Sequence, residues 1–341
     1  MNAFKRICAL ILGMVLLVAA LLKIMDPVGS SLVMGEYFNF LHLGFLKPLS
    51  AIFGEAFALL EGIVGIALIC GVWRRITALV SGILLLLFTL LTAVLYMAQP
   101  AMDCGCFGEA LHLSHAQTLL KNLILDVLWC LSFIPMHSLG KPQRIKYVSF
   151  SLSAASLLLF MLYSALSIPL RDFTSFKPGT ELEEHPLFFT DAGGNYVDSL
   201  SVNGPVMLIS IYDVSSLNEE GMGRLADFTA LCSSRGYTPL VLMAATPEQA
   251  AVLVSNPLLL SGIYFADRKD LMTLNRSNGG ACYVNDGLVV RKWAARNYPG
   301  PSELEEIMQQ APMDCMITNQ NRTRALFQGF SLYLFAVLLL L

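Results

Sequence analysis

Two cysteines one residue apart are the residues of this sequence best suited to chemistry. Cys104 and Cys106 flank Gly105, and Phe107 and Gly108 follow them. Cysteines at this spacing can bring their Cα atoms within the range of about 4.4–6.8 Å that a disulfide requires, and glycine relieves the backbone strain of so small a ring. Because a strained, exposed disulfide is labile and oxidising, the pair predicts thiol–disulfide exchange.

Two other interpretations of the pair stay open. One is a static disulfide that shapes a tight loop. The other is a zinc or copper site, whose ligands would be Cys104, Cys106, His112 and His115. Against the metal, Ser114 and Gln117 are typical of a capping box that begins a helix, which would place His115 in its first turn.

Two acidic residues inside apolar segments are further candidates. Glu61 and Asp126 would each cost about 2.5 kcal/mol or more in the centre of a bilayer, so we expect them to face the bundle interior, a partner or water. They would form a proton relay or a quinone contact for the cysteine pair. Alternatively, they join helices through hydrogen bonds, with Asn122 or Lys121 as partner.

The elements around these residues are predicted to be membrane spans. The chain is 55% hydrophobic and 14% charged, whereas soluble domains are about a quarter charged, and its net charge of −3 gives no reason to expect nucleic acid as a partner. Five segments reach the length of about 18 apolar residues that crosses a bilayer: Ile7–Met25, Leu49–Val72, Ile76–Ala98, Ala116–Met136 and Tyr147–Ile168. A sixth, shorter span is expected at 322–341. Lys23 and Glu55 are expected to pair near the outer ends of their helices.

The orientation follows from lysine and arginine in the short loops. A cytoplasmic N-terminus places most of these cations inside, namely Lys5, Arg6, Arg74, Arg75, Lys141, Arg144 and Lys146. The loop 99–115 and the segment 169–323 then lie outside. In a bacterium this is the periplasm, where disulfides persist.

The segment 171–321 has the composition of a soluble α/β domain. Val206–Tyr212 and Leu240–Ala245 are predicted strands around a helix at Glu219–Ser234, and Asn285–Gly287 predicts a hairpin. Ser302 and Glu305 predict a capping box for a last helix.

This order of elements resembles a thioredoxin-like domain. The segment 213–218, where the Cys-x-x-Cys of such a domain should follow the first long strand, contains no cysteine. Gly279 occupies the position at which a thioredoxin-like domain has a cis-proline. The resemblance therefore implies a domain that binds or positions partners and has lost the usual reaction.

Short motifs in roughly the first 135 residues resemble the DoxX/MauE superfamily. They are KIMDP at 23–27, LEG at 60–62, CGCFG at 104–108, KN at 121–122 and Asp126. The CGCFG motif resembles the methylamine-utilisation MauE branch, and the appended domain resembles a fusion found in Bacteroidota-type bacteria. The resemblance implies a role in disulfide formation or maturation of periplasmic proteins.

Together these patterns predict a bacterial inner-membrane protein. A helical bundle of about six spans occupies 1–170, a periplasmic thioredoxin-like domain 171–321, and the last span 322–341. The expected function is thiol–disulfide handling of envelope proteins by Cys104 and Cys106, which would make the chain a membrane thiol–disulfide oxidoreductase with a quinone as possible cofactor. The alternatives are a non-enzymatic scaffold or assembly subunit with a binding domain, and a periplasmic metal site.

Overall fold

The computed structural model describes residues 3–100, 102, 104–111, 113–135, 144–166, 169, 172–197, 203–253 and 262–340. The chain divides into two compact units. One unit joins Met1–Leu166 to Gly329–Leu341, and the other is Ser167–Gln328. His112, one of the four predicted metal ligands, lies outside the described residues.

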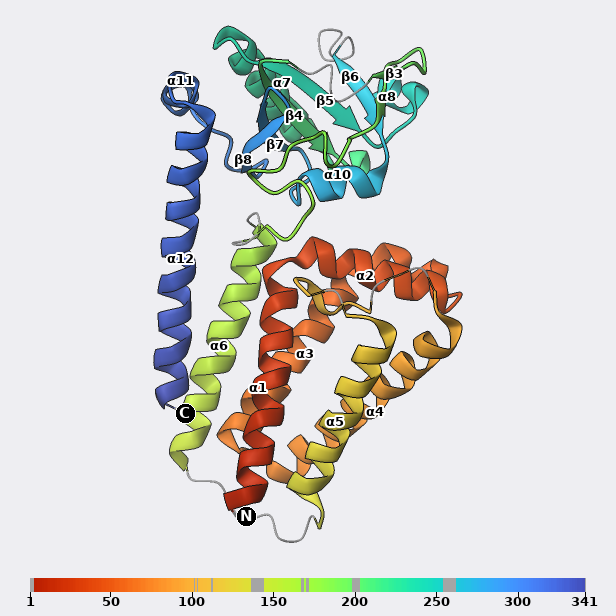
Figure 1. Cartoon of the computed structure of the whole chain (residues 1–341), viewed down its shortest axis with the longest axis vertical. Coiled ribbons are helices and arrows are strands. Elements are labelled where there is room, and N and C mark those ends of the chain that lie inside the picture. Colours follow the sequence, from red (N-terminus) through yellow and green to blue (C-terminus); the bar gives the residue numbers. More distant parts are fainter. Residues whose placement is uncertain are drawn as a thin grey trace. The chain divides into compact units, whose positions relative to one another are not determined.

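The first unit is a bundle of helices (Figure 1). Its elements are α1 (Ala3–Met25), α2 (Pro27–Phe40), the 3-10 helix η1 (Gly44–Leu49), α3 (Ser50–Cys70), α4 (Arg74–Ala98), β1 (Cys106–Glu109), α5 (His115–Phe133) and α6 (Arg144–Leu166). Within the described residues, five helical segments are long and apolar enough to cross a membrane: Ala3–Met25, Gly44–Cys70, Arg74–Ala98, His115–Phe133 and Lys146–Leu166. They match the five predicted apolar segments closely. The sixth span lies within α12 (Pro312–Leu340) and stays a prediction.

Glycines allow α1 and α3 to approach each other closely. A Cβ on Gly13 would lie 2.8 Å from the carbonyl oxygen of Gly65, and one on Gly65 would lie 2.8 Å from the carbonyl oxygen of Gly13. The two backbones are therefore in direct contact, as small residues permit between membrane helices. This crossing fixes which residues of α1 face which residues of α3.

Replacing Gly65 by alanine should destabilise the bundle. The new methyl group would meet main-chain atoms of Gly13 and Leu17 at 2.8 Å, and relieving such overpacking costs about 1–3 kcal/mol. The melting temperature of the detergent-purified protein should fall. Gly44→Ala is the matched control because nothing lies within 4 Å of its added methyl group. Equal melting temperatures for the two variants would contradict the close crossing.

The crossing also decides the partner of Lys23. Its Nζ lies 2.6 Å from a carboxylate oxygen of Glu61, whose side chain is 3% exposed. The predicted pairing of Lys23 with Glu55 is therefore wrong. The contact between Gly13 and Gly65 sets a register in which the end of α1 faces Glu61.

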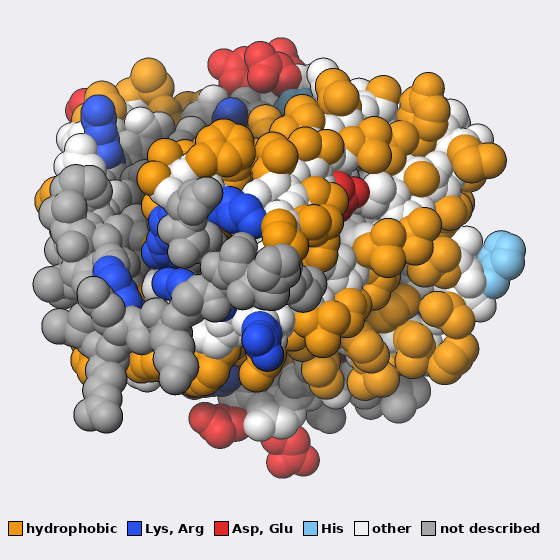
Figure 2. Space-filling view, turned by 90° about the horizontal axis from the view of Figure 1, so that it is seen from below, with side chains coloured by type: hydrophobic (Ala, Val, Ile, Leu, Met, Phe, Trp, Pro, Cys, Tyr) orange, Lys and Arg blue, Asp and Glu red, His pale blue; other side chains and the backbone are white. Residues whose placement is uncertain are grey.

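At the end of the bundle where α1 begins, basic side chains donate hydrogen bonds to backbone carbonyl groups. Arg6 donates to the carbonyl oxygens of Leu68, at 2.9 Å, and of Ile69. Lys5 donates to Ile134 at 2.7 Å. These residues belong to the start of α1 and the ends of α3 and α5. Figure 2 shows this face, with Lys and Arg side chains close together beside a broad hydrophobic surface.

The second unit is built on a mixed seven-stranded sheet. Its strands are β2 (Phe189–Thr190), β3 (Tyr196–Val197), β4 (Pro205–Ile211), β5 (Thr238–Met243), β6 (Ile263–Ala266), β7 (Gly280–Asn285) and β8 (Leu288–Trp293), in the order β3-β2-β6-β5-β4-β7-β8. β4, β5 and β6 are parallel, and the other pairs are antiparallel. The remaining elements are η4 (Val214–Ser216), α7 (Glu219–Ser234), α8 (Pro247–Leu253), α10 (Arg268–Leu274) and α11 (Pro301–Gln309).

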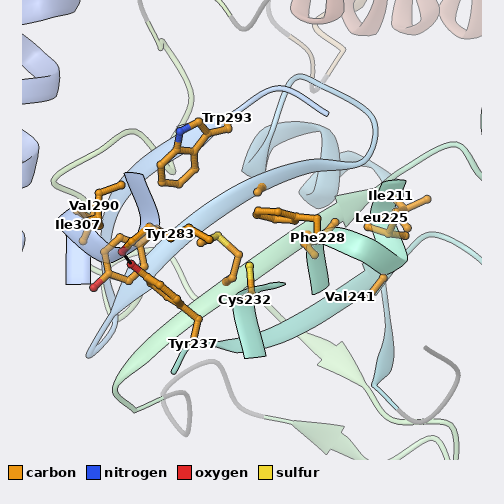
Figure 3. Close-up of a cluster of buried hydrophobic side chains, with 14 of the residues drawn as sticks. Ile211, Leu225, Phe228, Cys232, Tyr237, Val241, Tyr283, Val290, Trp293 and Ile307 are labelled. Carbon is orange, nitrogen blue, oxygen red and sulfur yellow. Dashed lines mark hydrogen bonds between the residues drawn. The ribbon is translucent and has the colours of Figure 1, made fainter. Parts of the chain in front are cut away.

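Successive side chains of the central strands point to opposite faces of the sheet, and a hydrophobic cluster covers each face. Met207 and Ile209 of β4 pack in one hydrophobic cluster, whereas Leu208 packs in the other, as the two-residue period of a strand requires. Figure 3 shows the first cluster, in which α7 contributes Phe228 and Cys232. Both long predicted strands, the predicted helix and the hairpin are confirmed by these elements.

One edge of this sheet is short, and the first part of the other edge is covered. β3 has two residues. At the other edge, the segment 179–182 runs along β8 and exchanges backbone hydrogen bonds with it. Gly179 donates to Val289 at 2.8 Å, Val289 donates to Thr180 at 3.0 Å, and Leu182 donates to Gly287 at 2.8 Å.

The predicted capping box of the last helix is wrong. α11 begins at Pro301, with Gly300 as N-cap and no side-chain capping bond. Ser302 therefore lies inside the helix and is not its N-cap. Glu305 instead accepts a hydrogen bond from Arg235 at 2.5 Å.

Candidate functional site

The cysteine pair lies in the connection between α4 and α5, at the end of the bundle opposite the basic end. Cys104 is 1% exposed and Cys106, at the start of β1, is partly exposed. The two sulfurs therefore differ in their access to the surroundings.

His115 is the partner of the buried cysteine. Its Nδ1 lies 2.9 Å from Sγ of Cys104, and its Nε2 lies 3.1 Å from the carbonyl oxygen of Pro100. A carbonyl oxygen only accepts, so Nε2 carries the proton, and in the neutral ring Nδ1 is left as an acceptor. The thiol of Cys104 therefore donates to a nitrogen that is able to take its proton.

The position of His115 follows from the local sequence. Ser114 is the N-cap of α5, and its side chain and that of Gln117 form the predicted capping box. His115 is thus the first residue of the helix, as predicted. The N-terminus of a helix carries a partial positive charge, so this end of α5 favours negative charge nearby.

α2 closes the other side of the buried cysteine. Tyr37 donates a hydrogen bond to the carbonyl oxygen of Cys104. Burial, followed by the nearby sulfurs of Cys106 and Cys104, raises the pKa of Tyr37 well above its ordinary value, so the phenol keeps the proton that it donates. Gly105 has a φ of 54°, and a Cβ at this position would collide with Val33. Only glycine fits between the two cysteines here.

The last two residues of the CGCFG motif, Phe107 and Gly108, pack against α5 and α1. The ammonium group of Lys121 lies 4.9 Å from the ring centroid of Phe107, a cation–π distance. Gly108 has a φ of 62°, and a Cβ on it would lie 3.7 Å from Cα of Lys23. The cysteine loop therefore packs next to the residue that forms the ion pair with Glu61.

The acidic candidates have different partners from those predicted. Glu61 pairs with Lys23, and it is one of the charges that raise the pKa of Tyr37, so it lies close to the site. Asp126 accepts a hydrogen bond from Thr89 of α4 at 2.8 Å. Asn122 and Lys121, the partners predicted for the acidic residues, instead contact α4 and the cysteine loop, because α5 packs against these two parts of the bundle.

Asn122 donates to Thr92 of α4 at 3.1 Å. This bond and that of Asp126 with Thr89 join α4 to α5, as the helix-joining interpretation expected of buried polar groups.

Metal ligands do not gather among the residues that the structure describes, where no group of three or more His, Cys, Asp or Glu side chains is placed to hold an ion. Cys104 and His115 do lie together. The full predicted set includes His112, which is outside the described ranges, so the Cys₂His₂ site is not tested.

Sequence reasoning missed the contact of His115 with Cys104, and it missed Tyr37 and Pro100 altogether. The capping box was the available signal for His115, because it placed this residue at the mouth of the cysteine loop. Tyr37 and Pro100 come from elements far from the motif, and their contacts depend on the packing of the bundle.

Comparison with known proteins gives one match. Residues 1–135 match the family model described as "Methylamine utilisation protein MauE". No curated protein and no solved structure matches the chain. The matched part contains the first four of the apolar helical segments and the cysteine loop, and both findings make this a membrane protein.

Proposed function

We propose that the MauE-like part of this chain, residues 1–135, exchanges disulfides with envelope proteins at the outer face of a bacterial inner membrane. Cys104 and Cys106 are the exchanging pair, and His115 is the base for Cys104. The 2.9 Å contact between Cys104 Sγ and His115 Nδ1 carries this proposal. Thiol–disulfide exchange proceeds through a thiolate, and a neighbouring base supplies one.

The outer location is supported by the basic residues at the other end of the bundle. Lys5 and Arg6 lie at the start of α1, whereas the cysteine loop packs against its end at Lys23. Cytoplasmic loops carry the excess of lysine and arginine. The cysteine pair then faces the periplasm, where its clients would fold.

The proposed exchange balances in electrons and protons. The disulfide of Cys104 and Cys106 takes two electrons from a client dithiol, whose sulfurs join, and the two client protons end on the pair. Re-forming the disulfide releases two electrons and two protons. A membrane quinone is the class of acceptor that we propose for them.

In the same proposal, the soluble unit is a thioredoxin-like domain that binds clients. The parallel pair β4–β5 on either side of α7, the hairpin β7–β8 and the helix α11 support this fold. The loop 213–218 lies beside Gly279, where a Cβ would be 3.8 Å from Leu217. Asn278 accepts from the backbone N–H groups of Tyr212 and Asp213. These contacts hold in place a loop that contains no cysteine, which suits a docking role.

The test is the redox state of the pair in bacterial cells, measured by acid quenching and thiol-trapping gel shift with and without respiration. We expect the pair to be oxidised during respiration and to become reduced when electron flow is blocked, and Cys104→Ser/Cys106→Ser should remove the shift. A pair that stays oxidised would overturn the proposal in favour of a structural disulfide in a scaffold. A pair that stays reduced would overturn it in favour of a metal site.

A further inference from the structure

We propose that the two cysteines have separate roles, with Cys106 forming the mixed disulfide with a client dithiol and Cys104, served by His115, acting as the resolving sulfur. This assignment rests on the proposed function. It also means that the client-facing sulfur is the second of the pair in the chain.

Access to the sulfurs carries the first part of the argument. Thiol–disulfide exchange requires direct contact between the attacking sulfur and the sulfur attacked. Cys106 is partly exposed, whereas Cys104 is 1% exposed and is enclosed by Tyr37 and His115. Part of Cys106 is therefore open to a client, whereas almost no surface of Cys104 is.

The position of the base carries the second part. A resolving cysteine must leave as a thiolate when the client attacks, and must attack as a thiolate in the reverse direction. Because Pro100 holds Nε2 of His115, its Nδ1 exchanges a proton with Cys104. The buried sulfur thus has the acid–base partner that its role requires.

The steps balance as follows. The first client thiol loses its proton to solvent, and its thiolate attacks Sγ of Cys106. The bond between Cys106 and Cys104 breaks, and Cys104 leaves as a thiolate. Nδ1 of His115 takes up a proton from solvent and passes it to this thiolate. The second client thiolate attacks the client sulfur of the mixed disulfide, and Cys106 leaves and is protonated in turn. The client has lost two electrons and the cysteine pair has gained them.

Single-cysteine variants of the full chain test this assignment in cells. In Cys104→Ser, the thiolate of Cys106 attacks the disulfide of an oxidised client, which is the reverse of the step above. Because Cys104 is not there to resolve the product, mixed-disulfide adducts should accumulate, and reductant should remove them on a non-reducing gel. Cys106→Ser should form no more adducts than Cys104→Ser/Cys106→Ser, which reports the background of the other six cysteines. That background is low in the soluble unit, because burial raises the pKa of Cys232 and of Cys282 to about 12 and keeps both protonated at neutral pH.

A second measurement on detergent-purified protein guards against misfolded variants. Variants that elute as wild type from size exclusion are reduced and mixed with Ellman's reagent. Cys106 in the Cys104→Ser protein should react about tenfold or more faster than Cys104 in the Cys106→Ser protein.

The outcomes separate the two proposals. Adducts mainly on Cys106→Ser, or equal adducts and equal rates for both variants, would overturn the separate roles while a cycling wild-type pair kept the proposed function. If the wild-type pair does not cycle and neither variant forms adducts, the proposed function fails, and the assignment fails with it.

Discussion

Replacing His115 by alanine should slow the oxidation of the reduced cysteine pair about 10²-fold at neutral pH. Proton transfer by a positioned side chain contributes a factor of this order or more, and Nδ1 of His115 is the group in contact with Cys104. Oxidation of the purified protein by glutathione disulfide, followed by maleimide gel shift, measures the rate.

The pH profile distinguishes a base from a structural residue at this position. Without His115, Cys104 must lose its proton to solvent, and the thiolate fraction of an ordinary thiol rises about tenfold for each pH unit below its pKa near 8.5. The defect should therefore be largest at low pH and shrink towards pH 9. A defect of the same size at every pH would show that His115 only holds the loop in shape.

Two further variants serve as controls. His115→Gln keeps a side chain able to donate to Pro100 but has no base, so it should preserve the melting temperature and not the rate. His185→Ala removes an exposed histidine of the soluble unit and should change neither.

Replacing Lys23 by methionine should destabilise the membrane bundle by about 3–5 kcal/mol, the cost of leaving one member of a buried ion pair without its partner. The carboxylate of Glu61 is 3% exposed, and an unpaired charge is costly inside a bilayer. The loss is measured as a lower melting temperature of the purified protein. Lys47→Met, which removes an exposed cation at the same end of the bundle, should have little effect.

A double-variant cycle isolates the pair. Lys23→Met/Glu61→Gln removes both charges, so it should be clearly more stable than Lys23→Met alone. If the two losses simply add, the interaction between Lys23 and Glu61 contributes nothing.

Patterns within one element could be predicted from the sequence, whereas contacts between elements could not. The apolar segments, the capping box of Ser114 and Gln117, and the hairpin at Asn285–Gly287 depend on residues a few positions apart, and the structure has all three. The capping box at Ser302 and Glu305 failed because the helix begins at Pro301, one residue before Ser302, so that Ser302 lies inside it, as the preference of proline for the first position of a helix favours.

The chemistry of the site depends on such long-range contacts. The cysteine pair is visible as a motif, but the proton acceptor of Cys104 depends on the ring of His115, which Pro100 orients. Likewise, the choice of Glu61 over Glu55 depends on a crossing of α1 and α3 that the glycines permit. Hydrophobic periodicity reports which face of a helix is buried and says nothing about the register between two helices.

The covered part of the edge of the second unit's sheet matters for a protein that is concentrated at a membrane. An open edge strand offers unpaired backbone groups to any neighbouring chain and so invites edge-to-edge aggregation. Here the segment 179–182 already satisfies backbone groups of Gly287 and Val289, and β3 at the other edge is two residues long. Copies of the protein crowded side by side therefore find less exposed strand on which to build a shared sheet.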